Sequence, residues 1–591
     1  MTMLARSHKI WFATLGLLAL ADPALLPLAR GQSAPSSAQA FGNNQVWLTY
    51  KGDLQRTASR NNPLTLPLNL IWRHSTLAAP KEYFGSPLVV GPPGQRRIYF
   101  PAGRNIVCID SQTGALLWRS TDFTSTITAP ISLLSGEGGD LILVVTTGGR
   151  LVALRTADGG QAWEADAQAA VFGTGPTFVN TPSGERILVG NARGSLVAFT
   201  REGTLDATWK VTLGRSTPNA TPAISVDGTR LFITTSDRKL FAVDLQKGAV
   251  AYGIQLKGST SAPPAVLDDR LIVANGTLVT ALRESTGETI WKTDTTEQIV
   301  ASPAVRVDEN GNRVIYIGTS RGNFYAIDAE RGRVLWKTSL KASVTGTAVV
   351  LKGLLLVGAS NGVFYGLNTE KGTVRWQYRL HSERMVTTKV TTRTRGAGAE
   401  GATPAAATSE TRTVMRPLGV SSAPSVVGTQ VYLLADNAAL YSFDMTPFDA
   451  DPPLAVQPSL SVPTTTVGLH SYLLNPDTPQ LVPPKGPIYF AVELNDEGSG
   501  VDPDSLKVSL NGQEIKTTFN AGKGIATALL AARDKTKLPD GLKNLTLTVR
   551  DYRGNALTYT TSFMVDSNVA SPAGRPPKPR VKNQQGTDGG R

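Results

Sequence analysis

The sequence has one cysteine and four histidines in 591 residues, which excludes several classes of site at the outset. The single Cys108 cannot form an intramolecular disulfide, a cysteine-rich zinc site or a c-type haem attachment. Beyond the N-terminal region the histidines are His74, His381 and His470, too far apart in the sequence to indicate a zinc site or a histidine-based triad. Cys108 lies in an apolar run and is interpreted as a small core residue.

Long apolar runs are also lacking. The first, Ile10 to Leu20, follows the basic residues Arg6 and Lys9 and is shorter than the roughly 20 residues that span a bilayer. This arrangement predicts a secretion signal over residues 1–40 with cleavage near Ala38-Gln39-Ala40, and a retained N-terminal anchor is the alternative. No cysteine follows the run, so a lipid anchor is not expected. We therefore expect an exported protein, periplasmic or at the cell surface, with no transmembrane span.

Acidic residues are fewer than basic ones, 46 against 59, which gives a net charge of +13. The excess is spread along the chain, and two segments concentrate it, an insertion at 381–416 and a tail at 568–591. Both are predicted to be solvated segments, and a weak contact with an anionic polymer or with lipid headgroups is the alternative. No nucleic acid partner is expected. The basic residues are Arg384, Lys389, Arg393, Arg395, Arg412 and Arg416 in the insertion and Arg575, Lys578, Arg580 and Lys582 in the tail.

What the sequence does contain is a repeat of about 40 to 46 residues. Each copy begins with a small residue and usually a proline, and there are eight such starts, from Ser86-Pro87 to Ala423-Pro424. Two alternating apolar strands follow, joined by a glycine- or asparagine-rich turn such as Asn191-Ala-Arg-Gly, which supplies the positive φ angles of a short hairpin. A period of this length with four short strands predicts the blades of a β-propeller.

An aromatic residue marks the last strand of each copy. Seven follow a turn glycine, whereas Trp72 stands alone 46 residues ahead of Trp118. An N-terminal strand is therefore predicted to complete the last blade and close an eight-bladed ring. The aromatics are interpreted as wedges between blades with locally bonded indoles, and a ladder that stacks a ligand is the alternative. They are Trp72, Trp118, Trp163, Trp209, Tyr252, Trp291, Trp336 and Trp376.

The unit Ala326-Ile-Asp-Ala-Glu-Arg-Gly-Arg-Val-Leu-Trp336 resembles the repeat of the pyrroloquinoline quinone (PQQ) repeat propellers, in the quinoprotein alcohol dehydrogenase-like superfamily. The segment from Trp47 to Ala58 resembles the opening of the same family. The resemblance implies an all-β, eight-bladed propeller over residues 41–446. The family includes quinoprotein dehydrogenases and non-catalytic scaffolds such as the propeller lipoprotein of the machine that assembles outer-membrane β-barrels.

The resemblance to the dehydrogenases implies a particular cofactor site. In those enzymes PQQ lies against a disulfide of adjacent cysteines, beside a calcium ion and an aspartate base. Cys108 alone cannot form that disulfide, and the repeat units are close to minimal. We therefore expect a non-enzymatic, monomeric binding scaffold without a cofactor, whose partner is an envelope protein or a cell-surface polymer. A divergent PQQ-dependent oxidoreductase or PQQ sensor, with PQQ and calcium, is the alternative.

After the propeller, residues 447–567 begin with a proline-rich linker and continue as short alternating strands such as Ile488 to Leu494. This pattern predicts a β-sandwich of roughly 100 residues. Loops such as Asp551-Tyr-Arg-Gly-Asn resemble those of bacterial immunoglobulin-like domains, which implies a spacer or adhesive module. One acidic loop could supply oxygen ligands to calcium, and an ordinary polar loop is the alternative. Its residues are Asp496, Glu497, Asp502 and Asp504.

Overall fold

The structure is a computed structural model that describes residues 46–62, 64–76, 83, 85–136, 139–308, 310–380, 383–392, 408–417, 419–446, 449–463, 469–532 and 537–572. The predicted signal peptide, residues 393–407 of the insertion and residues 573–591 of the tail lie outside these ranges. Within them the chain is built from strands and one 3-10 turn, η1 (Tyr50–Gly52). No helix of this described part is long and apolar enough to cross a bilayer.

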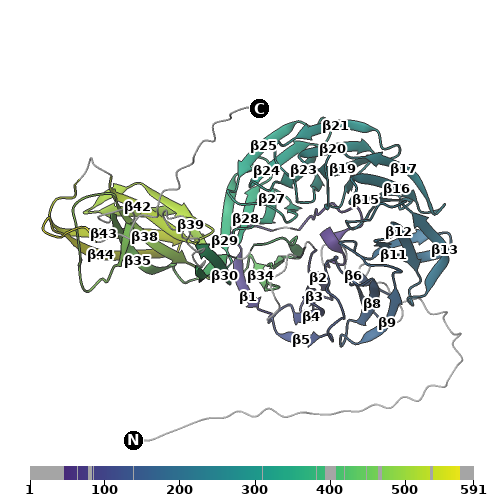
Figure 1. Cartoon of the computed structure of the whole chain (residues 1–591), viewed down its shortest axis with the longest axis horizontal. Coiled ribbons are helices and arrows are strands. Elements are labelled where there is room, and N and C mark those ends of the chain that lie inside the picture. The colour runs from purple at the N-terminus through teal and green to yellow at the C-terminus, as the bar shows by residue number, and fades with distance from the viewer. Residues whose placement is uncertain are drawn as a thin grey trace, which may run out of the picture.

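Four-stranded antiparallel sheets form the blades of a ring (Figure 1). In the first seven blades the strands follow the chain from the axis to the rim. The first blade is β2 (Leu88–Val90), β3 (Arg97–Ala102), β4 (Asn105–Asp110) and β5 (Leu116–Arg119), and the second is β6 (Ser132–Leu134), β7 (Leu141–Val145), β8 (Arg150–Arg155) and β9 (Gln161–Asp166). The third is β10 (Thr177–Thr181), β11 (Gly184–Asn191), β12 (Ser195–Phe199) and β13 (Leu205–Thr212), and the fourth is β14 (Ala223–Ile224), β15 (Arg230–Thr234), β16 (Lys239–Asp244) and β17 (Ala249–Gln255).

The remaining blades complete the ring. The fifth is β18 (Ala265–Leu267), β19 (Arg270–Asn275), β20 (Leu278–Arg283) and β21 (Thr289–Asp294), and the sixth is β22 (Ala304–Val307), β23 (Arg313–Gly318), β24 (Asn323–Asp328) and β25 (Val334–Ser339). The seventh is β26 (Val349–Leu351), β27 (Leu354–Gly358), β28 (Val363–Asn368) and β29 (Val374–Arg379). The eighth takes β32 (Ser425–Val427), β33 (Gln430–Leu434) and β34 (Leu440–Asp444) from the end of the repeat and β1 (Asn69–His74) from its start. The prediction of an eight-bladed propeller closed by an N-terminal strand is confirmed.

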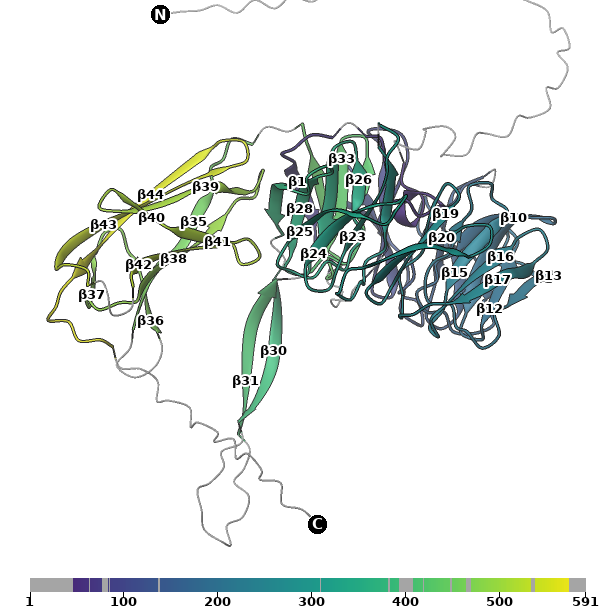
Figure 2. The same cartoon turned by 90° about the horizontal axis from the view of Figure 1, so that it is seen from above.

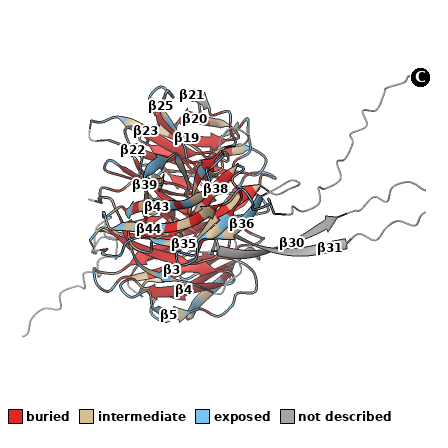
Figure 3. Ribbon diagram, turned by 90° about the vertical axis from the view of Figure 1, so that its left-hand side faces the viewer, coloured by how far each residue is buried: buried red, intermediate tan, exposed pale blue. Residues whose placement is uncertain are grey.

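Burial follows position in the blade. The third strand β12 is buried at every residue, whereas the outer strand β13 alternates between exposed and buried residues. The same contrast between red inner strands and paler outer strands is visible in the first blade in Figure 3. The hairpin between β11 and β12 turns at Gly194, whose φ of +73° favours glycine and whose added Cβ would lie 2.5 Å from the Gly214 carbonyl oxygen. The repeat therefore buries its apolar strands between neighbouring blades and leaves the rim to water.

Most of the aromatic wedges bond across to the next blade. Each of six donates to a backbone carbonyl 32 to 39 residues further along the chain, so the expectation of a local bond was wrong in its reach. The pairs are Trp72 with Ser111, Trp118 with Thr156, Trp209 with Leu245, Tyr252 with Glu284, Trp291 with Ala329 and Trp336 with Thr369, at 2.7 to 3.2 Å. The buried indole nitrogen of Trp163 has no hydrogen-bond partner among the described residues.

The insertion forms a long hairpin of β30 (Glu383–Thr392) and β31 (Thr408–Pro417) that projects from the ring (Figure 2). It lies in the connection between β29 and β32, so it leaves the ring where an outer strand passes to the next inner strand. The register pairs Arg384 with Arg416 and places Arg412 opposite Thr388.

The C-terminal unit is two five-stranded sheets beside the ring, which fit an immunoglobulin-like sandwich (Figure 1). One sheet has β36 (Leu469–Leu473), β35 (Leu454–Pro463), β38 (Ile488–Asn495), β42 (Ile525–Ala531) and β41 (Thr517–Asn520). The other has β37 (Gln480–Val482), β44 (Ala556–Val565), β43 (Gly541–Asp551), β39 (Val501–Leu510) and β40 (Gln513–Ile515), with β37 and β44 parallel. Alternate residues such as Phe490 and Leu547 fill the core between the sheets.

Candidate functional site

An N-terminal segment, Trp47 to Asn62, occupies the centre of the ring, where η1 is drawn in purple in Figure 1. We call it the axial segment. It bonds to seven of the eight blades, because its backbone adds hydrogen bonds to their inner strands and the Asn62 amide donates to the Gly428 carbonyl at 2.8 Å. The backbone pairs, at 2.9 to 3.0 Å, are Trp47 with Val89, Leu48 with Leu133, Leu54 with Ile224, Gln55 with Val266, Thr57 with Val305 and Ala58 with Val350.

The axial segment carries three buried cations. Lys51 Nζ donates to the Pro303 carbonyl at 2.6 Å, and Arg56 Nε donates to the Pro222 carbonyl at 2.9 Å. Arg60 lies 4.5 Å from the centre of the Trp47 ring, a cation–π contact. Burial lowers the pKa of Lys51 to about 7, and it lowers the pKa of Arg56 to about 10.

The charge of the axial segment is unbalanced. Among the described residues, Asp53 is the one carboxylate whose charge acts on the pKa of Lys51, Arg56 and Arg60. Its own oxygens accept from the backbone and hydroxyl of Thr57. The centre of the propeller is therefore a region of positive charge removed from water.

A pocket of about 560 Å³ lies where six outer-to-inner connections meet the axial segment. We call it the axial pocket. Tyr50 of the axial segment belongs to its lining. Six of the other twelve lining residues have side chains that can hydrogen-bond, and Phe172 is 51% exposed. The six connections contribute Thr128, Phe172, Asn219, Ser261, Val300 and Thr345. Such a lining can orient a polar ligand and stack on its apolar part.

Two of the buried cations bond to residues that adjoin the lining of this pocket in the sequence. Lys51 follows Tyr50, and its acceptor Pro303 follows the lining residue Ser302. The acceptor of Arg56, Pro222, follows the lining residue Thr221. Both cationic groups are therefore bonded to connections that form the pocket.

A second polar region joins the sandwich to the ring. The Trp376 indole donates to the Ser499 carbonyl at 2.8 Å, and Arg379 forms an ion pair with Glu493 at 2.7 Å. The backbone amide of Leu70 in β1 donates to the Gly498 carbonyl at 3.0 Å. The loop from Asp496 to Gly500 is therefore packed against the propeller.

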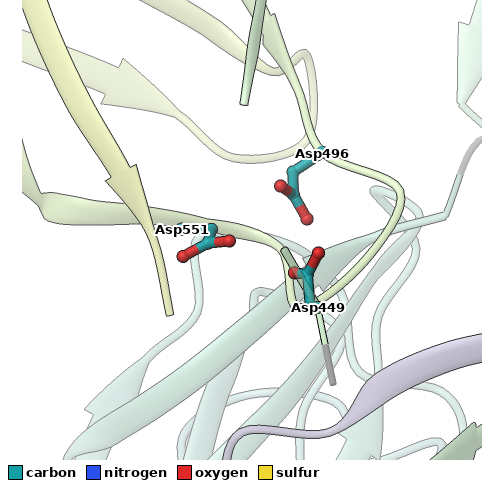
Figure 4. Close-up of side chains that lie close together, drawn as sticks. All are labelled: Asp449, Asp496 and Asp551. Carbon is teal, nitrogen blue, oxygen red and sulfur yellow. The ribbon is translucent and has the colours of Figure 1, made fainter. Parts of the chain in front are cut away.

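Three carboxylates meet at this loop, which itself supplies Asp496 (Figure 4). One oxygen each of Asp449, Asp496 and Asp551 lies within 4.8 Å of the others. Burial, opposed by hydrogen bonds from Gly500 and Gly498, raises the pKa of Asp496 to about 6, and the two neighbouring carboxylates add to the rise. Oxygen donors of this kind are those that calcium prefers.

Each of these carboxylates also accepts backbone hydrogen bonds. Asp496 accepts from Gly500 at 2.7 Å, Asp449 accepts from Ser499 at 2.7 Å, and Asp551 accepts from Asn555 at 2.8 Å. These bonds organise the turns on which the side chains lie.

The acidic residues named from the sequence are placed in different surroundings. Asp496 joins the cluster, whereas Glu497 and Asp504 are exposed and Asp502 is half-buried, with its carboxylate bonded to the Asp504 amide at 3.1 Å. Sequence reasoning missed Asp449 and Asp551 as neighbours of Asp496. The available signal was the Asp551-Tyr-Arg-Gly-Asn turn, but nothing in the sequence brought it to the linker.

Cys108 lies in β4 and is buried. Burial raises the pKa of its thiol to about 12, so the thiolate is not formed near neutral pH.

Comparison of the sequence with models of known protein families assigns the chain to a family. A PQQ-repeat family model described as outer membrane protein assembly factor BamB matches residues 102–260, 254–310 and 275–418, together more than half of the chain. The chain belongs to this family. A comparison with curated proteins found no match.

Solved structures of other PQQ-repeat proteins share its fold. A europium-containing methanol dehydrogenase is 13% identical with a TM-score of 0.51, over 69% of this chain and 100% of that one. The quinohemoprotein alcohol dehydrogenase of Comamonas testosteroni is 12% identical with a TM-score of 0.51, over 71% and 83%. The quinohemoprotein alcohol dehydrogenase ADHIIG of Pseudomonas putida HK5 is 12% identical with a TM-score of 0.52, over 73% and 85%. At identities of 12 to 13%, the similarity to these structures shows a shared fold alone.

Proposed function

We propose that the protein is an exported, non-enzymatic binding scaffold of the cell envelope, a monomer that captures a protein or polymer partner at the axial pocket. The observation that carries the proposal is the axial pocket itself. It combines polar side chains with the exposed ring of Phe172 and is backed by a segment bonded to seven blades. A rigid surface of this kind binds without reorganising, which lowers the entropic cost of association.

The position of the β30–β31 hairpin supports the choice of this face of the propeller as the binding face. It arises from an outer-to-inner connection, the class of connection that lines the axial pocket. A partner that enters the pocket would therefore meet an insertion that carries basic residues at Arg384, Arg412 and Arg416.

A PQQ-dependent oxidoreductase is the second function to test, because the quinoprotein dehydrogenases share the fold. The residues present do not fit the arrangement expected from the dehydrogenases. Cys108 is buried inside the first blade, and the described lining of the axial pocket includes no aspartate or glutamate.

The test is site-specific photo-crosslinking of the full-length protein in its own cells, followed by fractionation. A photoreactive phenylalanine replaces Phe172 at the pocket, and the control carries it in place of Val226, which is 66% exposed in the β14–β15 turn at the other end of an inner strand. We expect an envelope-fraction adduct from position 172 and not from position 226. Equal adducts at both positions, or none at 172, would contradict the proposal. Thermal-shift titration of the purified protein with PQQ and calcium tests the second function. The absence of a shift in the melting temperature at saturating PQQ and calcium would contradict it.

A further inference from the structure

The axial segment leaves a buried guanidinium group unsatisfied. Arg56 is fully buried, its Nε and Nη1 donate to protein acceptors, and its Nη2 has no partner among the described residues. Removing a charged donor from water without a partner is costly, so such a group favours an anion nearby. A second buried arginine nitrogen of the axial segment, Arg60 Nε, also has no hydrogen-bond partner among the described residues.

The surrounding charges do not neutralise this group. Asp53 faces Lys51, Arg56 and Arg60 as a single half-buried carboxylate, and the blades present backbone carbonyls at Pro222 and Pro303. Carbonyl dipoles satisfy individual N–H groups but do not cancel a net charge. The axial pocket next to these cations therefore lies in a positive field.

The pocket is shaped for an organic group. Its volume of about 560 Å³ is within the range of sites for small organic ligands, and Phe172, Pro130 and Val300 supply apolar surface beside the hydroxyl groups. An inorganic anion would leave most of this space unfilled. Hydroxyl donors such as those of Ser261 and Thr128 can bond to the two oxygens of a carboxylate.

We propose that the axial pocket binds an organic carboxylate, which the partner presents to Tyr50 and the connections around it while Lys51 and Arg56 compensate its charge from below. This inference rests on the proposed function, since it names the chemical group that the scaffold recognises.

The test is isothermal titration calorimetry of the full chain with benzoate and with its uncharged isostere benzamide. We expect benzoate to bind at least about tenfold more tightly, because only the carboxylate interacts with the buried cations. Ser261→Glu adds a negative charge at an exposed position of the lining and should raise the benzoate Kd at least about tenfold, whereas Ser261→Gln should leave it within about threefold. Equal binding of benzoate and benzamide, no binding of either, or equal effects of the two variants overturns the inference.

Further titrations identify the source of the carboxylate. Short peptides with a free C-terminus are compared with their amidated forms, and galacturonate is compared with galactose. Preference for the acid in at least one arm supports the inference, and indifference in both arms contradicts it. Inorganic phosphate is included because binding equal to that of benzoate would also contradict it.

These results separate the two proposals. A specific adduct at position 172 without any preference for carboxylates would support the scaffold function and contradict the carboxylate inference. If benzoate binds, Ser261→Glu abolishes that binding and no adduct forms at position 172, the carboxylate site is supported and the envelope partner is contradicted.

Discussion

Replacement of Trp376 by alanine should loosen the sandwich from the propeller. The indole is fully buried, packs against Phe364, Tyr378 and Phe443, and donates to the Ser499 carbonyl of the sandwich at 2.8 Å. Trp-to-Ala changes at such sites cost about 3 to 5 kcal/mol. Part of that loss falls on the contact with the sandwich, because the carbonyl partner belongs to that domain. We therefore expect cleavage of the linker between residues 446 and 454 by a broad-specificity protease to accelerate at least about tenfold.

Trp336→Ala is the matched control. Trp336 has the same position in the sixth blade, but its indole donates to the Thr369 carbonyl of the seventh blade at 2.9 Å. It should lower the melting temperature without accelerating cleavage of the linker. Trp376→Phe keeps most of the ring and removes the donor, which should cost about 1 kcal/mol. If Trp376→Ala and Trp336→Ala give the same linker cleavage and the same radius of gyration, the indole does not hold the sandwich and the reasoning fails.

Three further perturbations test the titrating and bonding groups. Because the folded-state pKa of Asp496 is raised from 3.8 to about 6, stability should fall with rising pH between these values by up to about 1.4 kcal/mol per unit, and urea titrations of Asp496→Asn should lack this slope. The pKa of Lys51 is lowered from 10.5 to about 7, so stability should instead rise with pH between 7 and 10.5; a Lys51→Met protein with the wild-type slope would contradict this. Tyr252→Phe leaves the Glu284 carbonyl without its 2.7 Å donor and should cost about 1 kcal/mol in thermal unfolding, and no change would show that water replaces it.

The sequence was sufficient for the ring because every part of the repeat has a local cause. The turn glycines permit positive φ angles, and the buried runs have the length of blade strands, as in the hairpin at Gly194. The position of Trp72 ahead of the first complete unit was enough to predict that β1 pairs with β34. The reach of the indole bonds was not predictable, because it depends on the angle between neighbouring blades.

The candidate sites depend on contacts that no short pattern encodes. Trp47 to Ala58 was recognised by resemblance, but its place at the axis follows from pairing with inner strands up to about 290 residues away, such as Val350 with Ala58. Asp449 lies in the linker and Asp551 at the end of β43, so their approach to Asp496 requires the sandwich to fold and dock. Long-range packing of this type is invisible to periodicity.

The docked sandwich follows from the way the ring is closed. In the sixth blade the acceptor of the preceding wedge is Ala329, the residue after the third strand, and the equivalent residue of the eighth blade is Met445. Because β1 supplies the outer strand, the chain need not turn back at Met445, whose carbonyl instead accepts from Arg553 at 2.9 Å. Trp376 would then lack an acceptor, and the Ser499 carbonyl supplies it. Closure by an N-terminal strand thus creates the vacancy that the sandwich loop fills, which makes the two domains one structural unit.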